Sequence, residues 1–116
     1  MNARELTDQI AAKLAAEVRR NGDIIPYIAE DGVYKTDMRQ KNLSWWTNGF
    51  WAGLLWQMYH AVGVAEFKAT AEKTEGWLDE AMADFTGLHH DVGFMWMLSA
   101  VADYRPATVA NDKIKK

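Results

Sequence analysis

The 116-residue sequence contains no cysteine. This absence excludes a disulfide, an iron–sulfur cluster, a thiolate zinc site and a cysteine nucleophile. The sequence also lacks a run of about eighteen apolar residues, so it predicts no membrane span and no membrane partner. Residues 1–20 carry charges throughout and have no apolar core of the kind found in signal peptides, which favours a cytoplasmic location.

An excess of positive charge is absent too. Lys and Arg are scattered, the formal net charge is -3, and no basic face is present, so nucleic acid is not expected as a partner. Hydrophobic residues make up 49% and charged residues 25% of the chain, which is typical of a globular protein. The length suffices for one domain.

Apolar residues recur at helical spacing in four segments, 3–20, 48–62, 65–86 and 92–104. The residues expected to face inward are Leu6, Ile10, Leu14 and Val18 in the first segment, Leu54, Leu55, Met58 and Val62 in the second, Phe67, Ala71, Leu78, Met82 and Phe85 in the third, and Met95, Leu98 and Ala102 in the fourth. Residues 21–44 predict an irregular loop with at most a small hairpin, and residues 107–116 a disordered tail. The predicted fold class is all-α, built from antiparallel helical hairpins.

Residues that favour helix ends flank these segments. They are Asn2 and Gly22 for the first helix, Thr47 or Asn48 and Gly63 for the second, Gly87 for the end of the third, and Asp91 and Pro106 for the fourth.

Two short motifs, residues 46–51 and 89–95, combine hydrogen-bonding or ionisable groups with large aromatic residues and a glycine at the predicted start of a helix. Such a combination suits a sugar site, because aromatic faces stack on the ring and carboxylates and amides bind its hydroxyl groups. Trp46 lies just outside its helix and is the better candidate for a stacking surface, whereas we expect Trp56 in the core.

Asp91 admits two interpretations that are compatible with each other. It can cap the helix that follows, or it can bind a ligand, and one carboxylate can do both. Its neighbours His89 and His90 can donate to it. Because adjacent residues point apart, these histidines do not predict a two-ligand metal site, and a zinc site that adds the distant His60 has little support. We expect no metal here.

Read together, the two motifs resemble those of unsaturated glucuronyl hydrolases, a family of glycoside hydrolases. The matching stretches are residues 46–56 (WTNGFWAGLLW) and 88–95 (LHHDVGFM), and the resemblance covers about residues 20 to 105. It implies that residues 1–106 form part of an (α/α)6 toroid with a central pocket. It also implies a substrate, an oligosaccharide released by a polysaccharide lyase with a 4,5-unsaturated uronic acid at its non-reducing end, and no cofactor.

In that family the enzyme hydrates the double bond, and two aspartates are important. The resemblance assigns one of them to Asp91, with Trp46, Asn48 and His90 binding the substrate. The other aspartate, usually the acid and base, matches no residue of this sequence. We therefore expect an N-terminal portion of about two hairpins of six, with little activity alone and with uncovered helix faces that favour self-association.

Two other interpretations remain open at this stage. The chain can be a non-catalytic helical module that binds a carbohydrate or a protein, which explains the aromatic residues without a second carboxylate. It can also be a purely structural helical bundle, which predicts that Trp46 and Asp91 are buried by mutual packing.

Overall fold

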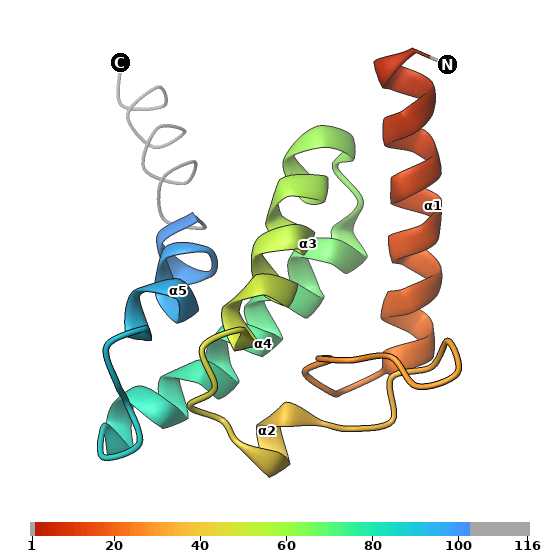
Figure 1. The fold of residues 1–116 in the computed structure, drawn as a ribbon. Helices are drawn as coiled ribbons and strands as arrows, with labels where there is room; N and C mark the ends of the chain where they lie inside the picture. Colours follow the sequence, from red (N-terminus) through yellow and green to blue (C-terminus); the bar gives the residue numbers. More distant parts are fainter. Residues whose placement is uncertain (1, 103–116) are drawn as a thin grey trace, which may run out of the picture.

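The computed structural model describes residues 2–102. Its helices are α1 (Ala3–Asn21), α2 (Met38–Lys41), α3 (Asn48–Val62), α4 (Ala65–Asp84) and α5 (Val92–Met97) (Figure 1). The described part contains no strand, only an antiparallel bridge between Glu30 and Val33. The all-α prediction is confirmed. The predicted tail, and the predicted helix end at Pro106, lie outside the described residues.

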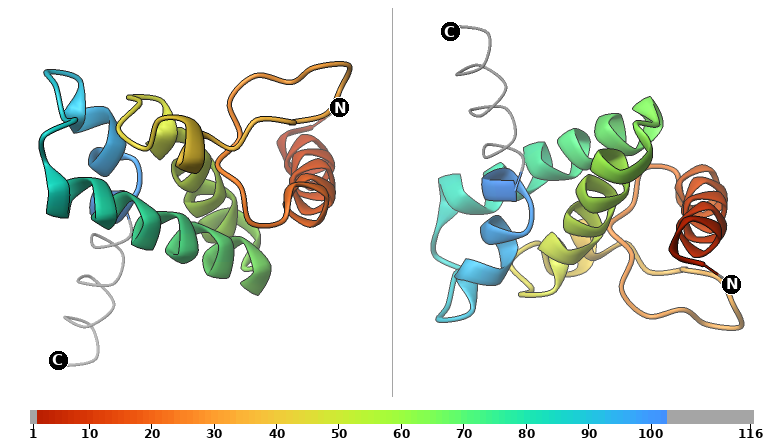
Figure 2. Two further views of the ribbon diagram at one scale, coloured as in Figure 1. Left: turned by 90° about the horizontal axis from the view of Figure 1, so that it is seen from below. Right: turned by 90° about the horizontal axis from the view of Figure 1, so that it is seen from above.

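Helices α3 and α4 form a hairpin whose link is Gly63 and Val64. Gly63 adopts the left-handed conformation (φ 71°) and donates its N–H to the Tyr59 carbonyl, which ends α3 as predicted. Helices α1 and α5 lie on opposite sides of α3, and α4 runs along one side of this row (Figure 2). None of the described helices combines the length and the hydropathy that crossing a bilayer requires.

The core consists of two clusters of buried side chains. The first joins α1, α3 and α4 and contains Leu14, Trp51, Ala52, Leu55, Trp56, Met58, Phe67 and Ala71. The second joins the loop after α1 to α2, α4 and α5 and contains Ile25, Met38, Leu78, Ala81 and Met95. Trp56 is 2% exposed, which confirms its place in the core. The second cluster holds the start of α5 beside the loop that precedes α3.

Helix α1 begins and ends as predicted, but only its C-terminal half is well packed. The Asn2 side chain accepts the Glu5 N–H at 2.8 Å, and Gly22 follows the last turn with φ 60°. Leu14 is buried, whereas Leu6 and Ile10 are exposed. The inward orientation predicted for these two residues is wrong, because no described element covers their side chains.

Several other predicted core residues are exposed as well: Leu54, Met82, Phe85 and Leu98. A helical stripe is buried only where a neighbouring element covers it, and periodicity alone does not tell where that neighbour ends. Helix α4 ends before Phe85, which adopts the left-handed conformation (φ 42°), and not at Gly87.

Two further details differ from the prediction. The predicted helix 92–104 is interrupted: α5 ends at Met97, and a turn at residues 98–99 follows, in which the Ser99 hydroxyl donates to the Met95 carbonyl at 2.6 Å. Residues 100–102 are helical again, and the rest of the predicted segment lies outside the described residues. The loop of residues 21–44 contains the unpredicted helix α2. Its cap is Asp37, whose Oδ1 accepts the N–H groups of Arg39 and Ile25. A four-residue helix is too short to show a period.

Candidate functional site

The two motifs meet because α3 and α5 pack with their backbones nearly in contact. A Cβ placed on Gly49 would stand 2.7 Å from the Phe94 carbonyl oxygen and closer still to that of Met95. One placed on Gly53, a turn later, would stand 2.9 Å from the carbonyl oxygen of Leu98. Only glycine permits this approach. The starts of α3 and α5 therefore lie side by side, although about forty residues separate them in the sequence.

Three aromatic rings gather at this contact. The ring centroids of Trp46 and Phe50 are 5.6 Å apart, those of Trp46 and Phe94 are 5.7 Å apart, and those of Phe50 and Phe94 are 6.4 Å apart. Trp46 is partly buried, whereas Phe50 and Phe94 are 41% and 49% exposed. We call these three residues the aromatic wall. Apolar faces open to solvent in this way are suited to stacking on a ligand ring.

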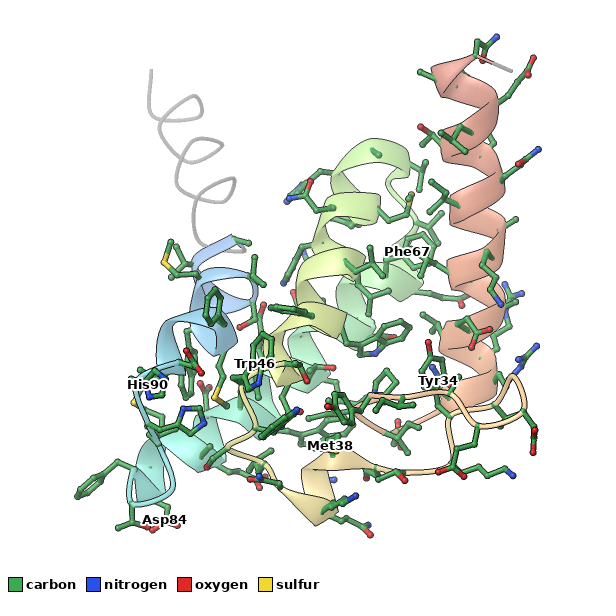
Figure 3. The ribbon with its side chains drawn as sticks, viewed as in Figure 1. Tyr34, Met38, Trp46, Phe67, Asp84 and His90 are labelled. Atoms are coloured by element: carbon green, nitrogen blue, oxygen red, sulfur yellow. The ribbon has the colours of Figure 1, made fainter. Side chains whose placement is uncertain are left out.

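Beside the aromatic wall lies a hollow of about 460 Å³, which we call the Asp91 hollow. Its lining residues are His90, Asp91, Gly93, Phe94, Met97 and Leu98. Trp46 is not among them and reaches the hollow only through its contact with Phe94. Figure 3 shows Trp46 beside α5 and His90 on the loop that precedes it. Asp91 and Trp46 therefore belong to adjoining surfaces that share Phe94.

Asp91 occupies the cap position of α5, but its side chain makes no capping hydrogen bond. The side chain is 33% exposed, and its Oδ2 lies 3.5 Å from Nε2 of His90. The capping interpretation of the carboxylate is therefore wrong in this structure. Mutual burial with Trp46, as a structural bundle would require, is not observed either, because both residues are only partly buried.

The histidines do not point apart. The ring centroids of His89 and His90 are 5.8 Å apart, and each residue of the triplet His89, His90 and Asp91 offers a ligand atom within 4.8 Å of the others. The prediction that adjacent histidines point apart is wrong for this turn. Here the Asp91 N–H donates a hydrogen bond to Nδ1 of His89 at 3.2 Å, which closes the turn. His60 lies elsewhere, stacked on Trp56.

Asn48 is fully buried at the start of α3. Its side-chain nitrogen donates to the carbonyl oxygens of Asn42 and Leu43, both at 2.9 Å, and its Oδ1 is buried without a hydrogen-bond partner. The amide therefore ties the loop after α2 to the first turn of α3. Because this loop carries Trp46, Asn48 fixes the position of the aromatic wall.

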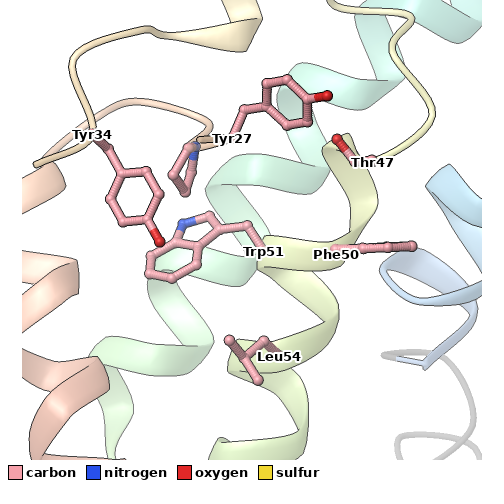
Figure 4. A pocket seen from close by; sticks show the side chains of 7 residues that line it. Tyr27, Tyr34, Thr47, Phe50, Trp51 and Leu54 are labelled. Carbon is pink, nitrogen blue, oxygen red and sulfur yellow. The ribbon is translucent and has the colours of Figure 1, made fainter. Parts of the chain in front are cut away.

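A second hollow, of about 270 Å³, lies on the side of α3 that faces the loop after α1, and no sequence motif predicted it. Its lining residues are Pro26, Tyr27, Tyr34, Thr47, Phe50, Trp51 and Leu54. Figure 4 shows the Tyr34 hydroxyl directed toward the Trp51 indole. The length of the loop was the only sequence signal, since long loops often carry function or bury their own side chains.

No family model matches the chain, and no solved structure gives a significant match. Among curated proteins, an unsaturated glucuronyl hydrolase of Bacillus sp. (strain GL1) is 34% identical over 91 residues, which are 78% of this chain and 23% of that protein. Unsaturated chondroitin disaccharide hydrolases of Streptococcus pyogenes serotype M1 and Streptococcus pneumoniae (strain ATCC BAA-255 / R6) are 38% and 39% identical over 61 residues, 52% of this chain and 15% of each relative. The chain spans less than a quarter of the length of these relatives. Over that part, the comparisons confirm that it resembles the unsaturated glucuronyl hydrolases.

Proposed function

We propose that this chain supplies part of the sugar site of an unsaturated glucuronyl hydrolase, within an (α/α)6 toroid. The observation that carries the proposal is the Asp91 carboxylate, which is partly exposed, makes no capping bond and lines a hollow that Phe94 connects to Trp46. The hydrolases that the chain resembles are named for unsaturated glucuronyl groups and for unsaturated chondroitin disaccharides. A carboxylate beside exposed aromatic rings suits such a ligand.

The proposed substrate is an oligosaccharide with a 4,5-unsaturated uronic acid at its non-reducing end. A proton adds to C4 and the oxygen of a water molecule adds to C5, so that the elements of water add across the double bond. Opening of the hemiketal breaks the bond between C5 and the ring oxygen and gives a ketone at C5. The hemiacetal left at C1 then collapses to an aldehyde, which breaks the glycosidic bond and releases the next sugar. The reaction requires a general acid that is still protonated near neutral pH and a positioned water molecule.

Within this reaction Asp91 accepts hydrogen bonds from ring hydroxyl groups and influences the acid that delivers the proton. His90, which is exposed beside it, contributes a further hydrogen bond to the sugar. Phe94 and Trp46 form the apolar side of the ring site. Asn48 is fully buried and supports the site indirectly, because its amide nitrogen positions the loop that carries Trp46.

The 116-residue chain by itself has little hydrolase activity under this proposal, because the resemblance assigns proton transfer to a second aspartate that matches none of its residues. The test is to incubate the purified chain with an unsaturated chondroitin disaccharide and to follow the ultraviolet absorbance of the double bond. Absorbance should stay constant. Robust turnover that Asp91→Asn abolishes would show that the chain is sufficient for catalysis and would contradict this part of the proposal.

Calorimetry with the same disaccharide tests the sugar site separately. We expect measurable binding that Asp91→Asn weakens by about tenfold or more, because a hydrogen bond to a charged group contributes about 1.5–3 kcal/mol. The matched control is Asp79→Asn, the same change at an exposed position of α4. Equal affinity in both variants would refute the role of Asp91. Binding without turnover also fits the alternative of a non-catalytic carbohydrate-binding module.

Self-association is the remaining part of the proposal. One face of α3 and α5 exposes a group of large apolar side chains: Phe50, Leu54, Phe94, Met97 and Leu98. Contiguous apolar surface of this kind is typical of an interface. We expect concentration-dependent association in sedimentation experiments, weakened by Leu54→Lys but not by Leu6→Lys, which changes a similarly exposed leucine on α1. A chain that stays monomeric at high concentration would contradict the proposed self-association.

A further inference from the structure

The turn before α5 brings three metal-ligating side chains together. His89, His90 and Asp91 each place a donor atom within 4.8 Å of the other two. Both histidines are exposed and the aspartate is partly exposed, so an ion can reach all three without any opening of the fold. No other group of this kind occurs among residues 2–102.

The distance between two of the donors already fits a metal ion. Nε2 of His90 lies 3.5 Å from Oδ2 of Asp91. This is long for a hydrogen bond, but it is close to the edge of a tetrahedron around Zn²⁺, which is about 3.3 Å for metal–ligand bonds of about 2.0–2.1 Å. An ion placed between these two atoms would therefore require little change in the distance between them.

The third donor atom belongs to His89, on the same turn. Nδ1 of His89 accepts the Asp91 N–H at 3.2 Å, which holds the ring beside Asp91, and binding an ion through this nitrogen would replace that hydrogen bond. All three donor atoms lie within 4.8 Å of one another, so no separation has to shrink by more than about 1.5 Å to reach the tetrahedral edge. Rotation of an exposed side chain supplies a movement of this size at low cost.

We propose that His89, His90 and Asp91 bind one divalent transition-metal ion of the Zn²⁺ type, with water at the remaining coordination positions. Imidazole and carboxylate donors suit Zn²⁺, Cu²⁺ and Ni²⁺ rather than the softer ions that require thiolates. Three protein ligands with one open position form a recurring arrangement for Zn²⁺. The ion would occupy the rim of the Asp91 hollow.

The test is to titrate the full chain with Zn²⁺ in a calorimeter and with Co²⁺ in a spectrophotometer, since the visible bands of Co²⁺ report nitrogen and oxygen coordination. We expect saturation at one ion per chain. His89→Ala, His90→Ala and Asp91→Asn should each weaken binding by at least about tenfold. The matched control is His60→Ala, which removes the remaining histidine of the sequence, far from this turn, and should leave the affinity unchanged.

Circular dichroism of each variant shows whether the helices are retained. Absence of saturable binding would overturn the proposal, as would equal affinity of the folded triplet variants and the unsubstituted chain. Loss of binding in His60→Ala would also overturn it. The titration contains no sugar, so its result does not depend on the proposed hydrolase site, although that site uses two of the same residues.

Discussion

Gly49 in α3 lies directly against the carbonyl oxygen of Phe94 in α5, with room for a hydrogen but not for a methyl group. From the sequence, Gly49 was only one member of a motif that suits a sugar site. The structure shows that another helix occupies the space beside it. Gly93, two residues after Asp91, differs, because a Cβ there would meet nothing within 4 Å.

Substitution Gly49→Ala should separate α5 from α3. We expect the free energy of unfolding to fall by about 1–3 kcal/mol, because the added methyl group would collide with backbone atoms that cannot rotate away. Urea denaturation measures the change. The matched control is Gly76→Ala in the interior of α4, where a Cβ meets nothing; there alanine should stabilise by about 0.5–1 kcal/mol. Equal stability of the Gly49 variant and the unsubstituted chain would refute the close contact.

Substitution Asn48→Ala removes the donor that serves the carbonyl oxygens of Asn42 and Leu43. We expect a loss of about 1–3 kcal/mol in the free energy of unfolding, because these groups lose their partner in a partly buried place. Asn48→Asp should cost more, since a carboxylate would face two carbonyl oxygens. Gln57→Ala, at an exposed position of α3, is the control and should change stability by less than about 0.5 kcal/mol. A neutral Asn48→Ala variant would refute the structural role.

The stability of the chain should depend on Glu17 in acid. The hydrogen bond from Lys13, at 2.7 Å, lowers the pKa of Glu17 below its usual 4.5; the charges of Arg20 and Lys13 lower this pKa further, while burial opposes them. A lowered folded-state pKa means that the stabilisation is present above about pH 4.5 and is lost as the pH falls through the folded-state value.

The measurement compares the unsubstituted chain with Glu17→Gln at several pH values. At neutral pH the variant should be less stable by up to about 1 kcal/mol, a modest value because the Lys13 side chain is 67% exposed. The difference should shrink below about pH 4.5. Glu72→Gln, in an exposed pair with Lys68, is the control and should show a smaller difference throughout. A Glu17 difference that does not vary with pH would contradict the assignment.

Substitution Phe85→Gly should stabilise the chain. Phe85 holds a left-handed conformation (φ 42°), which costs a residue with a side chain about 1–2 kcal/mol, and its ring is 69% exposed, so little packing is lost. We expect a higher melting temperature. Met82→Gly, inside α4 and also exposed, should instead destabilise by about 1 kcal/mol. A less stable Phe85→Gly variant would show that the ring makes contacts that exposure does not reveal.

Sequence patterns located the long helices well, because caps and apolar periods are local properties. The Asn2 cap and the Gly63 end are examples. Sequence patterns did not predict which apolar side chains are buried, because burial depends on a helix that is distant in the sequence. Leu54 is as apolar as Leu55, but only Leu55 meets a neighbouring helix that buries it.

In the candidate site, too, some features could be predicted from the sequence and others could not. Residue types selected Asp91 and Trp46, and both lie at the start of a helix on adjoining surfaces. The burial of Asn48 could not be predicted, since its partners belong to a loop without a periodic pattern. The convergence of His89 and His90 depends on how one turn folds, which a spacing rule for helices does not describe.

The Gly49 and Gly53 contact also bears on how such a site can diversify. Main-chain atoms set the spacing between α3 and α5 there, so the Phe94 ring and the Met97 thioether, which line the Asp91 hollow, can be exchanged without moving the two helices apart. Ligand preference can then change through substitutions at Phe94 or Met97, while the two helices keep their positions.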